Sequence, residues 1–332
     1  MWDEIKAFNR KKVLVTGGLG FIGSTLVRRL VELGAEVTVV DALIPDSGGN
    51  LFNVADVKER IELIIADVRD EAVAGRCVRG QDYLFNLVGQ VSHIDSMHNP
   101  YIDLESNCRT HLAILEACRK HSPEVKIVFA GTRQQYGRPD YLPVDEEHPL
   151  HPRDINGIHK MTAEYYHLLY NRVYGIRTVS LRLTNTYGPR QLMRHDRQGF
   201  VYWFIRQAID GETLRIFGDG SQLRDFTYVD DVVEAFLLAA LSAEANGKVF
   251  NLGGEKPFSL LEFVRTLFEV CGGGSYTLVP FPEERCRIDI GSFYADYSKI
   301  TRVLGWIPRV PLREGLRRTV AFYTSNKRHY WA

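Results

Sequence analysis

A glycine-rich loop between an apolar run and a helical pattern is the feature that most constrains the fold. Residues 13–16 have the sequence Val-Leu-Val-Thr, residues 17–23 have Gly-Gly-Leu-Gly-Phe-Ile-Gly, and Asp41 ends the next apolar run. Glycines let the backbone approach a pyrophosphate at a helix N-terminus, and an acid about 20 residues further on binds ribose hydroxyls. This order of elements predicts a dinucleotide site.

The same segment indicates which dinucleotide is bound. Glycines also occur in turns only to reverse the chain, so the prediction depends on the order of strand, loop, helix and acid. Asp41 repels a 2′-phosphate, and no Arg or Lys follows before Lys58, which favours NAD over NADP. Asp67 and Val68 follow the third apolar run, a position that suits contacts with the adenine edge of the dinucleotide. The expected cofactor-binding residues of this part are Gly17, Gly20, Phe21, Ile22, Gly23, Asp41, Asp67 and Val68.

Apolar β-branched runs alternate with amphipathic stretches and predict an α/β fold, a Rossmann-type doubly wound and mostly parallel sheet. Strands are expected at residues 13–16, 36–40, 61–66, 83–88, 126–130 and 178–183, and helices at 21–33, 103–120 and 156–173. After residue 188 the sequence changes to aromatic-rich helical patterns and short strands. We expect an NAD-binding domain over residues 1–185, to which 226–253 returns as a helix (226–241) and a strand, and a smaller α/β substrate domain over 186–225 and 254–332.

Composition excludes several classes of protein. Among 332 residues, Lys+Arg and Asp+Glu both number 41, so no overall basic field attracts nucleic acid or an anionic membrane. No apolar run reaches 18 residues and the first 12 residues are polar, so a cytoplasmic protein is expected. The five cysteines are scattered without zinc-site spacing, which predicts reduced, buried thiols and no metal site.

With these motifs the chain resembles the extended short-chain dehydrogenase/reductases of the nucleotide-sugar epimerase/dehydratase family, essentially from end to end. The segments that carry the resemblance are 16–23, 87–91, 132–137, 182–190, 218–226, 295–296 and 304–306. The resemblance implies a nucleotide-diphosphate sugar as substrate. It also implies a cycle in which a hydride passes from a sugar carbon to NAD and later returns.

The resemblance also implies roles for individual residues. Thr132 would bond a sugar oxygen, Lys160 would hold the nicotinamide ribose, and Leu87 and Gly89 would border the cofactor. A planar guanidinium binds phosphate oxygens bidentately, which suits arginine to the diphosphate. The residues expected at the nucleotide sugar are Asn185, Arg190, Arg224 and one of Arg285 and Arg287, of which the spacing favours neither clearly.

The chain departs from the family at the central catalytic position, where Asn156 stands in place of the family tyrosine. A Tyr and a Lys at positions i and i+4 share a helix face, where the ammonium stabilises the phenolate and makes the phenol a usable acid/base. Asn has no proton that titrates near neutral pH. Loss of a general base typically slows a reaction about 10²- to 10⁴-fold.

Four candidates for a replacement base remain open. Tyr136 is a phenol near Thr132, although the family has a tyrosine there too, for structure. His159 precedes Lys160 and lies within roughly 60° of the helix face that would carry the phenol, although the same spacing suits a histidine that packs on the helix. His93 follows a strand end where the family contacts substrate. Asn156 can also hold a water in the space of the missing ring.

Neighbouring residues narrow the reaction. Dehydratases and decarboxylases of the family place an acid just after the Thr, whereas this chain has Arg133 and Gln134, which disfavours elimination. Arg133 either binds a carboxylate or hydroxyls of the sugar or is exposed without a role. Residues 89–91 together with Ser96 are closest to the 2-epimerases of CDP-dideoxyhexoses.

The sequence therefore predicts an NAD-dependent nucleotide-sugar epimerase that works through a transient keto intermediate with an altered base. Two alternatives remain: another nucleotide-sugar transformation, such as an elimination or a step on a keto-sugar, and an inactive NAD-binding regulatory or assembly protein. The amphipathic stretches 103–120 and 156–173 resemble the helix pair of a family dimer interface, so a homodimer is expected.

Overall fold

A seven-stranded sheet forms the centre of the structure, a computed structural model that describes residues 5–331. The strand order is β11-β6-β5-β4-β1-β2-β3, and every neighbouring pair is parallel. The strands are β1 (Lys12–Thr16), β2 (Glu36–Asp41), β3 (Ile61–Ile65), β4 (Tyr83–Asn86), β5 (Lys126–Thr132), β6 (Arg177–Leu183) and β11 (Val249–Asn251). The predicted doubly wound α/β fold is confirmed.

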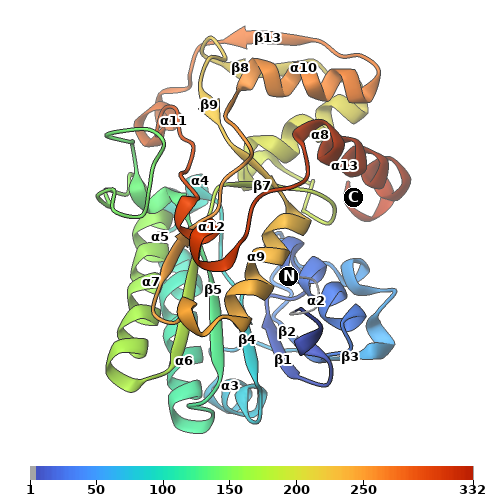
Figure 1. The fold of residues 1–332 in the computed structure, drawn as a ribbon. Helices are drawn as coiled ribbons and strands as arrows, with labels where there is room; N and C mark the ends of the chain where they lie inside the picture. The colour runs from blue at the N-terminus through green and yellow to red at the C-terminus, as the bar shows by residue number, and fades with distance from the viewer. Residues whose placement is uncertain (1–4, 332) are drawn as a thin grey trace.

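Helices bury both faces of this sheet (Figure 1). Along β1, Val13 and Val15 pack on one face and Leu14 on the other, which explains why the strand is apolar throughout instead of alternating. Helices α2 and α9 cover the first face, and α3, α6 and α7 cover the second. Their bounds are α2 (Phe21–Glu32), α3 (Glu71–Val78), α6 (Thr110–His121), α7 (Ile155–Tyr174) and α9 (Val229–Leu241).

Local sequence signals fix both ends of α7, the helix that carries Asn156 and Lys160. The side chain of Asp154 caps its first turn by accepting a hydrogen bond from Gly157 N at 2.6 Å. After Tyr174 the chain leaves the helix through Gly175, whose φ of 72° is left-handed. The first turn packs against α4 (His93–His98) and α5 (Pro100–Leu104), so residues after β4 and residues of α7 meet there.

Two expected helices differ from those observed. The stretch 103–120 is interrupted: α5 ends at Leu104, a π-helical turn η4 (Glu105–Arg109) follows, and α6 then begins. The prediction of a helix from residue 226 was wrong at its start, because Phe226–Tyr228 form strand β10, which pairs with β7 (Asn185–Tyr187). Aromatic residues suit such a strand, and α9 begins only after them.

A smaller group of helices and short strands lies above the sheet and has its own hydrophobic core (Figure 1). Its strands β8 (Leu214–Phe217) and β13 (Tyr276–Val279) pair in parallel, and β9 (Leu223–Arg224) pairs with β12 (Phe258–Ser259). From it, α9 and β11 lead the chain back to the sheet beside β6. The α-helices of this part of the chain are α8 (Phe200–Asp210), α10 (Leu260–Cys271), α11 (Glu283–Ile288), α12 (Ser298–Leu304) and α13 (Leu312–Asn326).

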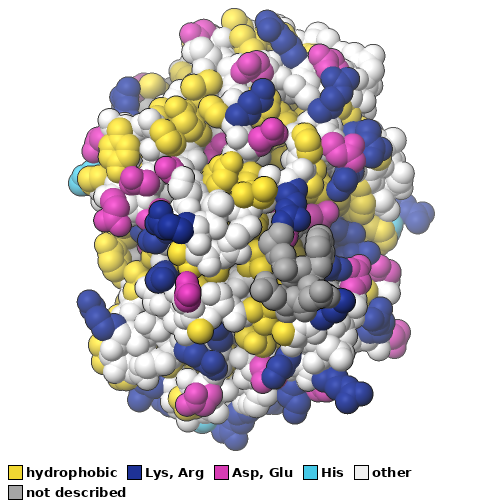
Figure 2. Space-filling view, viewed as in Figure 1, with side chains coloured by type: hydrophobic (Ala, Val, Ile, Leu, Met, Phe, Trp, Pro, Cys, Tyr) yellow, Lys and Arg dark blue, Asp and Glu magenta, His cyan; other side chains and the backbone are white. Residues whose placement is uncertain are grey.

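The surface agrees with the balanced composition. Figure 2 shows Lys and Arg side chains intermingled with Asp and Glu over the face in view, without a field of one sign. Within residues 5–331, no helix combines the length and the apolar character that a membrane span requires. The same residues contain no group of three or more His, Cys, Asp or Glu placed to bind a metal ion.

The five cysteines are free thiols, but they are not all buried. Cys77, Cys108 and Cys118 lie in the interior and Cys271 is half-buried. Cys286 is exposed, contrary to the expectation, because it lies on the short helix α11, which has no buried residue.

Candidate active site

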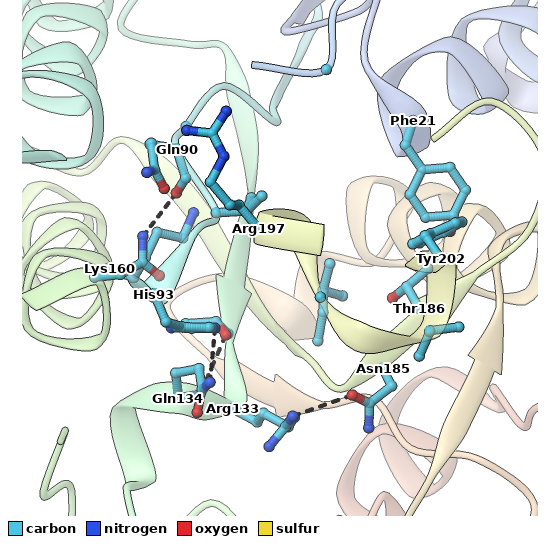
Figure 3. A pocket seen from close by; sticks show the side chains of 18 of the residues that line it. Phe21, Gln90, His93, Arg133, Gln134, Lys160, Asn185, Thr186, Arg197 and Tyr202 are labelled. Atoms are coloured by element: carbon cyan, nitrogen blue, oxygen red, sulfur yellow. Dashed lines mark hydrogen bonds between the residues drawn. The ribbon is translucent and has the colours of Figure 1, made fainter. Parts of the chain in front are cut away.

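A cavity of about 480 Å³ opens at the carboxyl edge of the sheet, between the sheet and the smaller group of helices. Its walls come from the loops after β1, β4, β5 and β6 and from residues of α8 and α11. β1 lies between β4 and β2, where the strand order reverses, and such a switch point is where doubly wound sheets bind ligands. Figure 3 shows His93, Gln134 and Lys160 on one side and Phe21 with Tyr202 on the opposite side.

The glycines of the loop after β1 have different functions. A Cβ at Gly17, whose φ is 72°, would lie 2.9 Å from Leu87 O, and one at Gly23 would lie 2.2 Å from Gly17 O, so the fold itself requires both. A Cβ at Gly20 would meet only Gly17 O, at 3.3 Å. Gly20 caps α2 and borders the cavity. A side chain there would fill the space in which a helix N-terminus binds a pyrophosphate.

A second, smaller cavity adjoins the first and shares Gly17, Gly20 and Gly89 with it. Asp41 borders it, and its carboxylate accepts hydrogen bonds from Leu19 N at 3.1 Å and Leu43 N at 2.9 Å. Burial raises the pKa of Asp41, and these backbone bonds partly oppose the rise. An ionised carboxylate has about four lone pairs, so Asp41 keeps acceptor capacity for ribose hydroxyls.

Asp67 and Val68 border the same small cavity, at the position expected for the adenine edge. Asp67 pairs with Arg69, with 2.5 Å between Oδ2 and Nη2. The hydrogen bond from Arg69 lowers the pKa of Asp67. Together with Asp41 and the glycine loop, these residues fit the adenosine and pyrophosphate parts of a dinucleotide.

Lys160 is a buried cation that borders the large cavity and contacts the end of β5. Its Nζ donates a hydrogen bond to Ala130 O at 2.6 Å and lies 4.6 Å from the centre of the Phe129 ring. Burial lowers the pKa of Lys160 to about 8. An ammonium group has three N–H donors, so Lys160 retains donor capacity for ribose hydroxyls after bonding Ala130.

Asn156 borders the cavity, but its amide is engaged with the protein. Nδ2 donates to Gln90 O at 2.9 Å and to Asp103 Oδ2 at 3.0 Å. Asp103 is 1% exposed, and its other oxygen lies 2.7 Å from Nδ1 of His159. A buried carboxylate needs such partners, because an unpaired charge in the interior is costly. Asn156 therefore holds the Asp103 carboxylate and the loop after β4 together, and it has no titratable proton.

His93 lies at the start of α4, with its ring between two polar side chains. Nδ1 is 3.0 Å from Asp154 Oδ2, and Nε2 is 2.8 Å from Nε2 of Gln134. The hydroxyl of Ser96 donates to His93 O at 2.6 Å and accepts from Asn156 N at 3.1 Å, which joins the starts of α4 and α7. Burial alone would raise the pKa of Asp154, but the proximity and charge of His93 lower it.

Two arginines lie close together at the end of the cavity nearer the smaller group of helices. Arg133 donates to Asn185 Oδ1 at 3.2 Å, and Arg224 lies 3.8 Å from Asp289 Oδ1. Burial and the charge of Arg224 lower the pKa of Arg133 to about 9. Among the described residues, neither Nη1 of Arg133 nor Nε of Arg224 has a hydrogen-bond partner, although both atoms are buried. The arrangement suits a bound anion.

Four residues expected at the site border neither cavity in the described part of the chain. His159 faces Asp103, and Ser96 is buried between the two helix starts. Arg190 stacks 5.4 Å from the centre of the Phe322 ring. Arg287 is on exposed α11 and pairs with Glu283.

Arg285, the other arginine considered for this role, does border the cavity and lies 2.6 Å from Asp196. The other expected site residues border one or both cavities: Gly17, Gly20, Phe21, Ile22, Gly23, Leu87, Gly89, His93, Thr132, Arg133, Asn156, Lys160, Asn185 and Arg224 in the large one, and Asp41, Asp67 and Val68 in the small one.

No sequence signal predicts the contact between Asp154 and His93. An aspartate before a helical pattern is typical of an N-cap, and Asp154 does cap α7. Its second oxygen, however, reaches a residue that is 61 positions earlier in the chain. Only the packing of α4 against α7 brings the two side chains together.

The model of the NAD dependent epimerase/dehydratase family matches residues 13–253. The chain belongs to this family. It is 35% identical, over 95% of its length and 99% of the relative's, to a putative UDP-glucose 4-epimerase of Methanocaldococcus jannaschii. NAD is the cofactor of the family, which agrees with the glycine loop and Asp41.

Solved structures agree with this membership. The UDP-glucose 4-epimerase of Thermotoga maritima, solved with UDP-glucose, is 34% identical and has a TM-score of 0.85, with 95% of this chain and 99% of that chain covered. The UDP-glucose 4-epimerase of Thermus thermophilus, in complex with NAD, is 32% identical and has a TM-score of 0.84, with 94% and 98% covered.

The contrast between Gly20 and Gly23 is testable. Gly20→Ala should weaken NAD binding at least about tenfold and lower stability by less than about 1 kcal/mol, since its Cβ enters the ligand space and not the protein. Gly23→Ala should destabilise by about 1–3 kcal/mol, because its Cβ overlaps Gly17 O. Calorimetric titration with NAD and urea unfolding measure the two effects. Equal losses of stability in both variants would contradict this assignment.

The lowered pKa of Lys160 predicts a pH dependence of NAD binding. Below pH 8 the free protein carries the ammonium, whereas above about pH 8 the amine must take up a proton to bind as a cation. NAD affinity should therefore fall as the pH rises through about 8, at most tenfold per unit. Titrations in buffers of different ionisation enthalpy measure the proton uptake. Lys160→Met should show no such uptake, and an unchanged wild-type affinity up to pH 10 would rule out this role.

Proposed function

We propose that this chain is an NAD-dependent nucleotide-sugar epimerase that oxidises a sugar hydroxyl transiently to a ketone and uses an acid/base other than tyrosine. One observation carries the proposal: a single cavity brings Lys160 and Thr132, at the end of the sheet, to the same space as Asn185 and Arg224. The epimerase names of the relatives described above support it.

The nucleotide diphosphate would bind at Arg133, Arg224 and Asn185. The Asn185 amide is held in place, because Nδ2 donates to Asp225 O at 2.8 Å while Oδ1 accepts from Arg133. The two guanidinium groups repel each other, and each keeps a buried N–H group that has no hydrogen-bond partner within residues 5–331. A diphosphate would satisfy these donors and screen the repulsion, and bidentate binding suits arginine.

The sugar would lie between Thr132 and the opposite wall. Thr132 Oγ1 accepts a hydrogen bond from Gln134 N at 3.3 Å, so its hydroxyl proton remains for a sugar oxygen. The rings of Phe21 and Tyr202 pack edge to face, with 5.4 Å between their centres. They would form an apolar wall that limits the access of water to the sugar. NAD, when bound, accepts a hydride from the sugar carbon and returns it.

The residues after Thr132 favour epimerisation over elimination. Elimination needs an acid/base near the leaving hydroxyl, and Arg133 and Gln134 occupy these positions. With a pKa of about 9, Arg133 is cationic at neutral pH. It donates to Asn185 and does not serve as a proton acceptor there.

One observation favours a second candidate, a transformation of a sugar that is already a ketone. Both N–H groups of Asn156 are used by Gln90 O and Asp103, and the amide has no proton to exchange. A step on a keto-sugar requires no deprotonation of a hydroxyl, so it would not need a titratable group at position 156. The two candidates share the fold, the cofactor and the diphosphate site.

Purified protein with NAD should interconvert one of a panel of UDP-, GDP-, CDP- and dTDP-sugars without added reductant. Mass spectrometry of the native protein identifies the bound nucleotide and the sugar mass, and absorbance of reduced cofactor reports oxidation. Turnover only of keto-sugars would support the second candidate. An NAD-bound protein that neither retains nor converts any nucleotide sugar would instead be a non-catalytic binding protein.

We also propose a homodimer formed through α6 and α7. Ile158, Tyr165, Leu169 and Val173 recur along one face of α7 and are each more than 40% exposed. This stripe is apolar surface that a second copy would bury.

In sedimentation experiments, Tyr165→Lys combined with Leu169→Lys should halve the mass, because two charges would enter the apolar contact. Leu278→Lys, at an equally exposed leucine on β13, is the matched control and should leave the mass unchanged. A wild-type protein that sediments as a monomer would exclude this dimer.

A further inference from the structure

We infer that His93 is the catalytic acid/base of this chain, the group that takes the proton of the sugar hydroxyl and later returns it, and that Asp154 positions it. This inference rests on the proposed epimerase function. It identifies the residue that performs the work of the absent phenol.

The first support is the location of the ring. His93 borders the large cavity together with Thr132 and Lys160. Its Nε2 contacts the side chain of Gln134 (Figure 3). The backbone N–H of Gln134 donates a hydrogen bond to the hydroxyl of Thr132. Nε2 and the hydroxyl of Thr132 are thus both in contact with Gln134, in the wall of the same cavity.

The second support is the tautomer that the neighbours impose. Asp154 is 2% exposed at its side chain, and its lowered pKa keeps it a carboxylate, which can only accept hydrogen bonds. Asp154 Oδ2 lies 3.0 Å from Nδ1, outside hydrogen-bond geometry, and its negative charge favours the neutral tautomer of His93 that carries the proton on Nδ1. The lone pair of Nε2 therefore points away from Asp154, toward Gln134. This is the arrangement of a base oriented by a carboxylate.

The side-chain amide of Gln134 can form a hydrogen bond with His93 in either protonation state of the imidazole. Its Nε2 donates to the lone pair of His93 at 2.8 Å, and its Oε1 is buried without a partner among the described residues. When His93 becomes an imidazolium, both ring nitrogens are donors. Without substrate, a half-turn of the Gln134 amide would then present Oε1 as the acceptor for Nε2–H of His93. During the reaction, a sugar hydroxyl would take the place of this amide at Nε2.

The step is balanced within the groups named. The O–H bond of the sugar would break and its proton would pass to His93 Nε2, while NAD, when bound, would be the oxidant that takes the hydride of the sugar C–H bond. The carbinol carbon would become a ketone, and the negative charge of Asp154 would stabilise the imidazolium. Return of the hydride to the other face of the carbonyl, with the proton from His93, completes the inversion.

The other polar groups near the vacant phenol position are less suited to this step. Nδ1 of His159 faces the buried Asp103, and His159 borders neither cavity in the described part of the chain. Asn156 has no titratable proton. Tyr136 is completely buried, bonds Asn251 at 2.7 Å, and has a pKa raised by burial.

His93→Gln tests the catalytic role. It should lower kcat about 10²- to 10⁴-fold and change KM less than about threefold, since it removes the base but leaves the cavity polar. His98→Gln is the matched control, because His98 is an exposed histidine on the same helix. In His93→Ala, added imidazole should restore part of the turnover, which a purely structural histidine would not allow. A His93→Gln protein with wild-type kcat would overturn the inference and leave the epimerase function intact.

Asp154→Asn tests the positioning role, because asparagine remains a good N-cap for α7 and removes only the carboxylate. It should lower kcat and leave KM and thermal stability nearly unchanged. Nitrogen-15 NMR of labelled histidine gives a readout that needs neither cofactor nor substrate: wild-type His93, assigned by comparison with His93→Gln, should be protonated at Nδ1, and Asp154→Asn should lose this preference. An Nε2–H tautomer in the wild type would overturn the inference even if no sugar is converted.

Discussion

Parallel pairing on both sides of β1 is the constraint on which the rest of the site depends. Because every neighbouring pair in the sheet is parallel, the strands all end at one edge, and each following loop starts there. The chain goes to one side of β1 through β2 and β3 and to the other through β4, β5 and β6, so the loops diverge above β1. The cavity occupies this divergence and is bordered by the glycine loop on one side and by His93, Thr132 and Lys160 on the other.

A buried carboxylate explains how the fold accommodates asparagine at position 156. Asp103 is almost fully enclosed, and its two oxygens are taken by Asn156 and His159. Both residues lie in the first turns of α7, so one polar cluster fixes the start of that helix against α5. Asn156 and His159, which the sequence places beside Lys160, thus both bind the buried Asp103 carboxylate, whereas His93 and Asp154 lie side by side at the cavity.

Buried positive charge lies in the wall of the cavity. Lys160 and Arg133 are both buried cations of the cavity wall with lowered pKa values. Such groups cost free energy in the empty protein and become favourable when an anion or a set of hydroxyls satisfies them. Much of the electrostatic free energy stored in the site would therefore be released on binding the cofactor and the nucleotide diphosphate.

The sequence by itself determined the fold class and the cofactor, since the signals for both depend on local order. Apolar runs predict strands, and a glycine loop between strand and helix predicts the pyrophosphate position, because these signals lie within a few neighbouring residues. Local pattern was insufficient at Phe226, where pairing with β7 outweighs the helical pattern of the residues that follow.

Only the tertiary structure decided which polar side chains face the substrate space. The sequence favours His159 over His93 as the base, but His159 is turned to Asp103, whereas His93 lies beside Asp154 at the cavity. Arg285 and Arg287 are two residues apart on α11, and only Arg285 borders the cavity in the described part of the chain. The direction of a side chain depends on the elements packed against it, and those elements come from distant parts of the sequence.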